Sequence, residues 1–155
     1  MITELKANEV FVFGSNGTGF HGAGAAGFAC RGDSRNTWRQ DTWFQRAMKS
    51  LEGSEDRVGK WAVYGVALGF QQGREGQSYA IQTVTRPGAK RSVTRREIYY
   101  QLVDLWEVIR NEPSKVFLIT PLGEGYAGYT HEEMKEVWDF LILKHGERSN
   151  VRFIK

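Results

Sequence analysis

The sequence predicts an α/β protein in which helices and strands alternate around a largely parallel sheet. Two kinds of segment support this fold class: short apolar runs rich in β-branched and aromatic residues, and longer segments whose apolar residues recur at helical spacing. These segments alternate along most of the 155 residues, as they do in strand–helix–strand units. We therefore expect an α/β sandwich.

Four segments have the composition of strands and are bounded by turn residues: 9–14, 78–83, 115–120 and 151–154. Residues 61–70 alternate poorly and contain two glycines, so we interpret them as a strand that runs into a loop. Residues 71–77 are interpreted as a turn.

Three helices are expected between the strands. The first, 21–30, is short and consists mainly of small residues. Each of the other two begins with a capping box, Thr94–Glu97 or Thr130–Glu133, in which a hydroxyl and a carboxylate bond each other's backbone N–H groups. Pro113 stops the first of these two helices and Gly146 ends the second.

The chain as a whole has the character of one folded domain, 1–155. Hydrophobic residues make up 41 % and aromatic residues 13 %, which is typical of globular proteins. Cys30 is the one cysteine, so no internal disulfide can form, and a reducing, cytoplasmic compartment is expected. No apolar run approaches membrane-spanning length, so we expect no membrane partner. Residues 31–60 are polar and interrupted by glycines, and we interpret them as an insertion or lid that includes a helix capped by Asp41.

A glycine-rich segment follows the first strand and leads into the first helix: Gly14, Ser15, Asn16, then His21, Gly22, Ala23, Gly24 and Ala25. Glycine lets a ligand approach the main chain closely. The unpaired N–H groups of a helix N-terminus favour phosphate. The segment therefore suggests a nucleotide or pyrophosphate site, with close packing of a helix on the sheet as the alternative. It matches neither the GxGxxG fingerprint nor the phosphate loop that ends in Gly-Lys-Ser/Thr.

A second glycine-rich loop, 121–129, directly follows the strand 115–120. Ligands of open α/β sheets bind beyond the carboxyl ends of the strands. Both loops follow strands, so we expect them at the same edge of the sheet, and this convergence favours a ligand that carries phosphate.

Five cations lie within eleven residues that contain no acid: Arg86, Lys90, Arg91, Arg95 and Arg96. Such a cluster can bind the phosphates of a ligand, bind nucleic acid or form a solvated face. Tyr99 and Tyr100 follow it, and aromatic rings beside cations are typical of single-strand binding. Because the two tyrosines are adjacent on a predicted helix, we do not expect both to face one strand of bases.

Three motifs, in order, resemble a macrodomain-like group found in bacteria and phages. The first is Phe13-Gly14-Ser15-Asn16 with His21-Gly22-Ala23-Gly24-Ala25-Ala26. The second, Gly76-Gln77-Ser78-Tyr79-Ala80-Ile81-Gln82-Thr83, is similar to the group's G-x-S-Y-A-I-P-T strand, with Gln82 in place of Pro. The third, Gly123-Glu124-Gly125-Tyr126-Ala127-Gly128-Tyr129, resembles its G-C-G-L-A-G-Y loop, with Glu124 where Cys is common.

This resemblance implies a three-layer α/β/α sandwich with a mixed, largely parallel sheet that binds ADP-ribose or a related nucleotide. Asn16 then stands where the group's asparagine reaches the distal ribose. The diphosphate is expected between two loops, formed by Gly22, Ala23 and Gly24 and by Gly123, Gly125, Tyr126 and Ala127. The resemblance implies no cofactor.

Catalysis is a second implication of the resemblance, with ADP-ribosylated protein or nucleic acid as substrate. In the DNA-deribosylating branch, an Asp acts on the ribose at the position of Ala127, and alanine cannot replace it. The supporting lysine of that branch, expected after the middle strand, has no clear counterpart here, although Lys90 is near enough to consider. Glu124 and His21 are the remaining candidates for acid–base chemistry, because one is a carboxylate in the second loop and the other an imidazole that titrates near neutral pH. The alternatives are that Glu124 points to solvent and that His21 is a turn residue whose ring bonds the backbone. No two histidines have the spacing of metal ligands, so we expect no metal.

Overall fold

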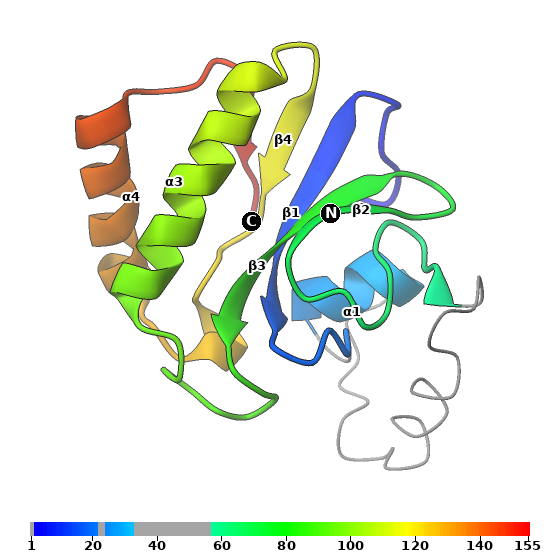
Figure 1. Cartoon of the computed structure of the whole chain (residues 1–155), viewed down its shortest axis with the longest axis horizontal. Coiled ribbons are helices and arrows are strands. Elements are labelled where there is room, and N and C mark those ends of the chain that lie inside the picture. Colours follow the sequence, from blue (N-terminus) through cyan, green and yellow to red (C-terminus); the bar gives the residue numbers. More distant parts are fainter. Residues whose placement is uncertain (1, 22–23, 33–56) are drawn as a thin grey trace.

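A computed structural model describes residues 2–21, 24–32 and 57–155 (Figure 1). Five strands form one sheet: β1 (Glu9–Asn16), β2 (Gly69–Gln72), β3 (Gln77–Val84), β4 (Val116–Ile119) and β5 (Val151–Phe153). The helical elements are α1 (Gly24–Arg31), α3 (Arg95–Asn111), the 3₁₀ turn η2 (Gly125–Ala127) and α4 (His131–His145).

The strands follow the order β2-β3-β1-β4-β5. β1 lies between β3 and β4 and is parallel to both, and β5 is parallel to β4. β2 pairs antiparallel with β3 at one edge. The sheet is thus mixed and largely parallel, as predicted.

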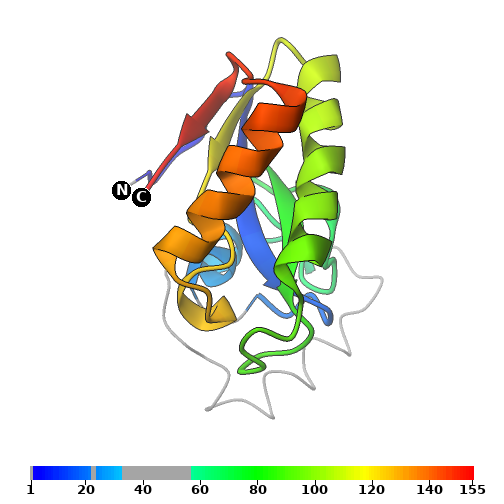
Figure 2. The ribbon, with the colours of Figure 1, turned by 90° about the vertical axis from the view of Figure 1, so that its left-hand side faces the viewer.

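Helices cover both faces of the sheet (Figures 1 and 2). α3 and α4 lie side by side on one face, and α1 lies on the other. Successive residues of β1 alternate between the two cores: Val10 and Val12 belong to the cluster under α3 and α4, whereas Phe11 and Phe13 pack on the α1 side. Burial on both faces explains why the strand is a continuous apolar run. The three-layer α/β/α sandwich is confirmed.

Both predicted capping boxes are present. The Thr94 hydroxyl accepts a hydrogen bond from the Glu97 N–H at 3.1 Å, and Glu97 Oε1 accepts one from the Thr94 N–H at 3.3 Å. The corresponding distances for Thr130 and Glu133 are 3.1 and 2.9 Å. α4 ends before Gly146, whose φ is 80°.

The sequence-based boundaries of β2 were wrong. Gly69–Gln72 forms the strand, although residues 71–77 were expected to be a turn and the strand was expected within 61–70. Gln71 is the physical reason, because its amide accepts from the Val63 N–H and donates to the Val66 carbonyl, both at 2.7 Å. The polar side chain of Gln71, the one buried residue of this edge strand, is thereby satisfied.

Residues 33–56, most of the predicted insertion and its helix capped by Asp41, lie outside the described residues. In the part of the chain that the structure describes, no helix is long and apolar enough to cross a membrane.

Candidate functional site

A cavity of about 750 Å³ lies where β1, β3 and β4 end at their carboxyl termini. Its volume is within the usual range for sites that bind small molecules, roughly 300–1,000 Å³. Both glycine-rich segments line it, together with strand ends and the residues after β3: Gly14, Ser15, Asn16, Phe20, Gly24, Ala25, Ala26, Thr83, Val84, Pro87, Gly88, Lys90, Thr120, Pro121, Gly123, Glu124, Gly125, Tyr126 and Ala127. The two loops therefore converge at one edge of the sheet.

Asn16 organises the first loop from the end of β1. Its Oδ1 accepts hydrogen bonds from the Thr18 N–H (2.9 Å), the Thr18 hydroxyl and the Gly19 N–H (3.0 Å). Its Nδ2 donates to the Phe20 carbonyl at 3.0 Å. This is the local turn chemistry that asparagine favours. Asn16 lines the cavity, and its amide nitrogen carries a second hydrogen besides the one donated to Phe20.

The N-terminus of α1 forms the next part of the wall. Gly24 has φ of 59°, and Ala25 and Ala26 continue the lining. These residues carry the first N–H groups of the helix, which have no partner within the helix itself. Their small side chains leave the backbone accessible from the cavity. Gly22 and Ala23 lie outside the described residues.

The second loop forms the opposite wall. Gly123, Gly125 and Gly128 have φ of 80°, 62° and 92°, so glycine suits all three positions. Tyr126 between them is 58 % exposed. A Cβ placed on Gly24 would lie 3.4 Å from the Tyr126 ring. The phenol of the second loop thus reaches the helix that begins after the first.

Glu124 brings a carboxylate to the cavity. Its Oε1 lies 3.3 Å from Nδ1 of His131, the first residue of α4. The His131 imidazole is exposed, whereas the Glu124 side chain is 23 % exposed. Ala127, at the end of η2, lines the cavity without a functional group.

His21 is placed elsewhere. Its side chain is buried, its ring meets Phe13 edge to face with centroids 5.2 Å apart, and its Nε2 donates to the Val63 carbonyl at 3.0 Å. Burial lowers the pKa of His21 to about 4, and the bond to Val63 offsets this only partly. The ring of His21 thus bonds the backbone, as one of the two alternatives from the sequence had it, and His21 is not among the described residues that line the cavity.

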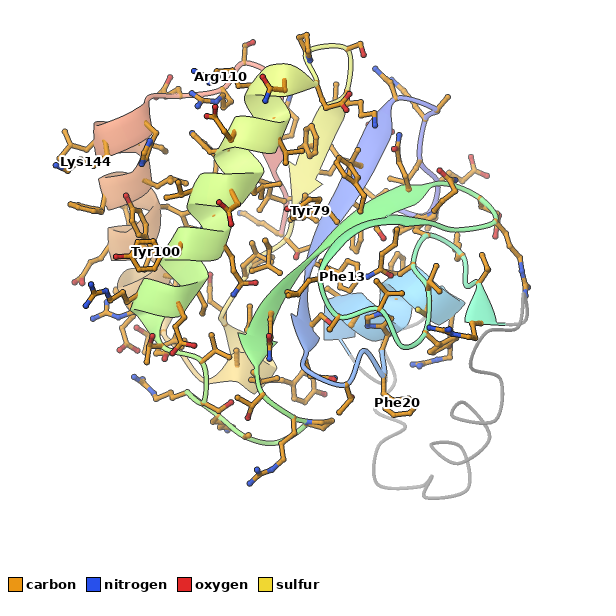
Figure 3. All side chains as sticks on the ribbon, viewed as in Figure 1. Phe13, Phe20, Tyr79, Tyr100, Arg110 and Lys144 are labelled. Atoms are coloured by element: carbon orange, nitrogen blue, oxygen red, sulfur yellow. The ribbon has the colours of Figure 1, made fainter. Side chains whose placement is uncertain are left out.

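Figure 3 shows Phe13 inside the fold and Phe20 beyond the end of β1. Phe20, Thr83 and Thr120 line the cavity, and the sequence analysis did not single them out. The two threonines are at or just after strand ends, and that position is the sequence signal that could have found them.

The basic cluster is divided among different environments. Lys90 lines the cavity, Arg91 and Arg95 form ion pairs with Glu133 and Glu136 on α4, and Arg96 lies over the Tyr100 ring at 5.7 Å. Three of these cations are therefore engaged in contacts within the fold, and Lys90 is the one that lines the cavity. Among the described residues, no group of three or more His, Cys, Asp or Glu side chains could hold a metal ion.

No protein-family model matches the chain, and no curated protein matches it in sequence. Solved structures do resemble it. A Bacteroides thetaiotaomicron protein of unknown function has a TM-score of 0.54 at 12 % identity, over 96 % of this chain and 89 % of that chain. The macrodomain of Mycobacterium tuberculosis DarG has a TM-score of 0.51 at 18 % identity, over 97 % of this chain and 90 % of that chain. At these identities the likeness concerns the fold, and the protein has a macrodomain-like α/β fold.

Proposed function

We propose that the cavity binds ADP-ribose or a closely related nucleotide. The observation that carries this proposal is the convergence of the two glycine-rich segments on one cavity at the carboxyl edge of the sheet. The fold shared with a solved macrodomain adds support at the level of the fold.

The cavity walls suit the parts of such a ligand. The N–H groups at the start of α1 and around η2 can bind diphosphate oxygens. The Asn16 amide can bond ribose hydroxyls. Phe20 and Tyr126 supply aromatic surface for a sugar or base.

Calorimetric titration with ADP-ribose, with AMP and NAD as comparison ligands, tests the proposal. We expect micromolar binding of ADP-ribose, and AMP weaker by at least about 10-fold because it lacks the diphosphate and the distal ribose. No heat of binding for any of the three, from protein whose circular dichroism shows it folded, would reject the proposal.

Hydrolysis of an ADP-ribosyl bond is the second candidate, because Glu124 is a carboxylate at the cavity in contact with an imidazole. Glu124 would accept a proton from the water that attacks the anomeric carbon. The bond from that carbon to the modified residue breaks, and the departing group takes up a proton from solvent. We expect ADP-ribose release from modified protein or nucleic acid, slowed by about 100-fold or more in Glu124→Gln. Chromatography of the released nucleotide measures it. Equal release by the Gln variant, or none from ester or N-glycosidic linkages, would reject the candidate.

A further inference from the structure

We infer that Lys90 supplies the cationic contact to the ligand's phosphates, and that Arg91 is the positioning residue that holds Lys90 at the cavity. This inference rests on the proposed function and deepens it, since it assigns the residues after β3 to the binding site.

Lys90 lies against the second glycine-rich loop. A Cβ on Gly128 would lie 2.9 Å from the Cβ of Lys90 and 3.3 Å from its Cγ. The stem of the lysine therefore packs directly on the loop that follows η2. Pro87, Gly88 and Lys90 all line the cavity, so the segment after β3 forms part of its wall in addition to the two glycine-rich loops.

Lys90 is the one cationic side chain among the described residues that line the cavity. Lys90 forms no ion pair with another described residue, and the acids Glu133 and Glu136 at the start of α4 pair with Arg91 and Arg95. The Glu124 carboxylate at the same cavity contacts His131. A cavity-lining lysine that has no ion pair with the described acids suits a phosphate.

Arg91 fastens the segment from three sides. Its N–H donates to the Ala127 carbonyl at 2.7 Å. Its guanidinium donates to both carboxylate oxygens of Glu133, at 2.6 and 2.8 Å, and lies over the Tyr129 ring at 4.9 Å. Glu133 is itself fixed by the capping box of α4. Arg91 therefore joins the segment to η2 and to the start of α4 at once.

The backbone of Arg91 has an unfavourable conformation, and the contacts of its side chain offset the free-energy cost of that conformation. Its φ is 56°, and it is the one non-glycine residue in the described ranges with positive φ. A left-handed conformation is unfavourable for a residue with a long side chain and persists where the surroundings hold it. The positive φ turns the chain immediately after Lys90. Lys90 therefore lines the cavity, whereas Arg91 bonds Glu133 at the start of α4.

The test measures ADP-ribose affinity and its salt dependence in matched variants. Lys90→Gln is expected to lose about 10- to 100-fold in affinity, the worth of a charge-assisted contact, and its affinity should decline less steeply with added NaCl. Lys90→Arg keeps the charge and should stay within about threefold of the parent. Wild-type affinity and salt dependence in Lys90→Gln would overturn the inference while leaving the proposed function standing.

Arg91→Gly tests the positioning role, because glycine keeps the left-handed backbone while removing the guanidinium. We expect a loss approaching that of Lys90→Gln, with little further loss when both changes are combined. Arg95→Ala is the matched control: it removes a neighbouring ion pair to α4 without touching the Lys90 segment, and should bind as the parent. Additive losses in the double variant would overturn the positioning role.

Inorganic pyrophosphate separates the inference from the proposed function. Should the wild type bind pyrophosphate but not ADP-ribose, and Lys90→Gln bind neither, the phosphate contact stands and the proposed nucleotide is wrong. Binding of neither probe by the wild type would overturn both.

Discussion

A Gly24→Glu variant is expected to lose ADP-ribose affinity by at least about 100-fold, because a like charge at a binding surface costs several kcal/mol. Gly24 lines the cavity at the start of α1, where the diphosphate is proposed to lie. A side chain there begins 3.4 Å from the Tyr126 ring, so it also fills the space between the two walls. The exposed phenol can move aside, and we expect the fold to survive. Calorimetry measures the affinity, and thermal unfolding reports the fold.

Gly24→Gln is the control, since it adds the same length without the charge and takes the same backbone strain at φ of 59°. A smaller loss in Gln than in Glu would assign the difference to repulsion of the phosphates. Equal losses would assign the effect to filled space alone. Parental affinity in Gly24→Glu would contradict the placement of the ligand at the start of α1.

Much of the fold could be predicted because its signals are local. The run Phe11-Val12-Phe13 is apolar on both faces and became the central strand β1. The capping boxes at Thr94 and Thr130 set the starts of α3 and α4 to the residue. The bounds of β2 were predicted wrongly because the Gln71 amide is hydrogen-bonded to the backbone of Val63 and Val66. Hydrogen bonds of this kind, from a side chain to the backbone of a loop, leave no periodic pattern in the sequence.

The convergence of the two glycine-rich loops followed from topology, since parallel strands deliver their following loops to one edge. The sequence placed Lys90 in a cluster of cations that could bind phosphates, but it could not show which of the five lies at the cavity. We infer that its place at the cavity depends on two features, the positive φ of Arg91 and the close approach of the Lys90 side chain to Gly128. Both are properties of two loops packed together, and neither loop's sequence shows them by itself.

The surroundings of His21 could not be predicted from its neighbours in the sequence. It stands in a glycine-rich motif, and its neighbours in sequence suggested a place beside the ligand. Its neighbours in space are Phe13 and Tyr64, with the Val63 carbonyl as hydrogen-bond partner. Val63 is 42 residues away along the chain. The direction of one side chain in an irregular segment is decided by such distant contacts.

Protonation of His21 is expected to make the protein less stable as pH falls from about 6.5 toward 4. Burial lowers its pKa in the folded state to about 4, from the ordinary value of 6.5. Between these values the unfolded chain binds the proton and the folded chain does not, so the free energy of unfolding falls with falling pH. The difference amounts to about 3 kcal/mol once both states are protonated. Thermal unfolding at a series of pH values should show Tm dropping by about 6–12 °C from this group.

His21→Gln isolates the contribution of the imidazole, because glutamine can still donate to the Val63 carbonyl but does not titrate. The variant's Tm should depend less on pH between 6.5 and 4 than the parent's does. Near neutral pH, the two curves of Tm against pH should run parallel, separated by a constant difference. Carboxylates are common to both proteins, so their effects on Tm cancel in that comparison. Arg91 and the Thr130 N–H lower the pKa of Glu133 to about 2, so Glu133 titrates below this pH range. Parallel profiles for the parent and His21→Gln would mean that the imidazole is protonated in the folded protein, and would return His21 to the set of groups that can exchange protons at the site.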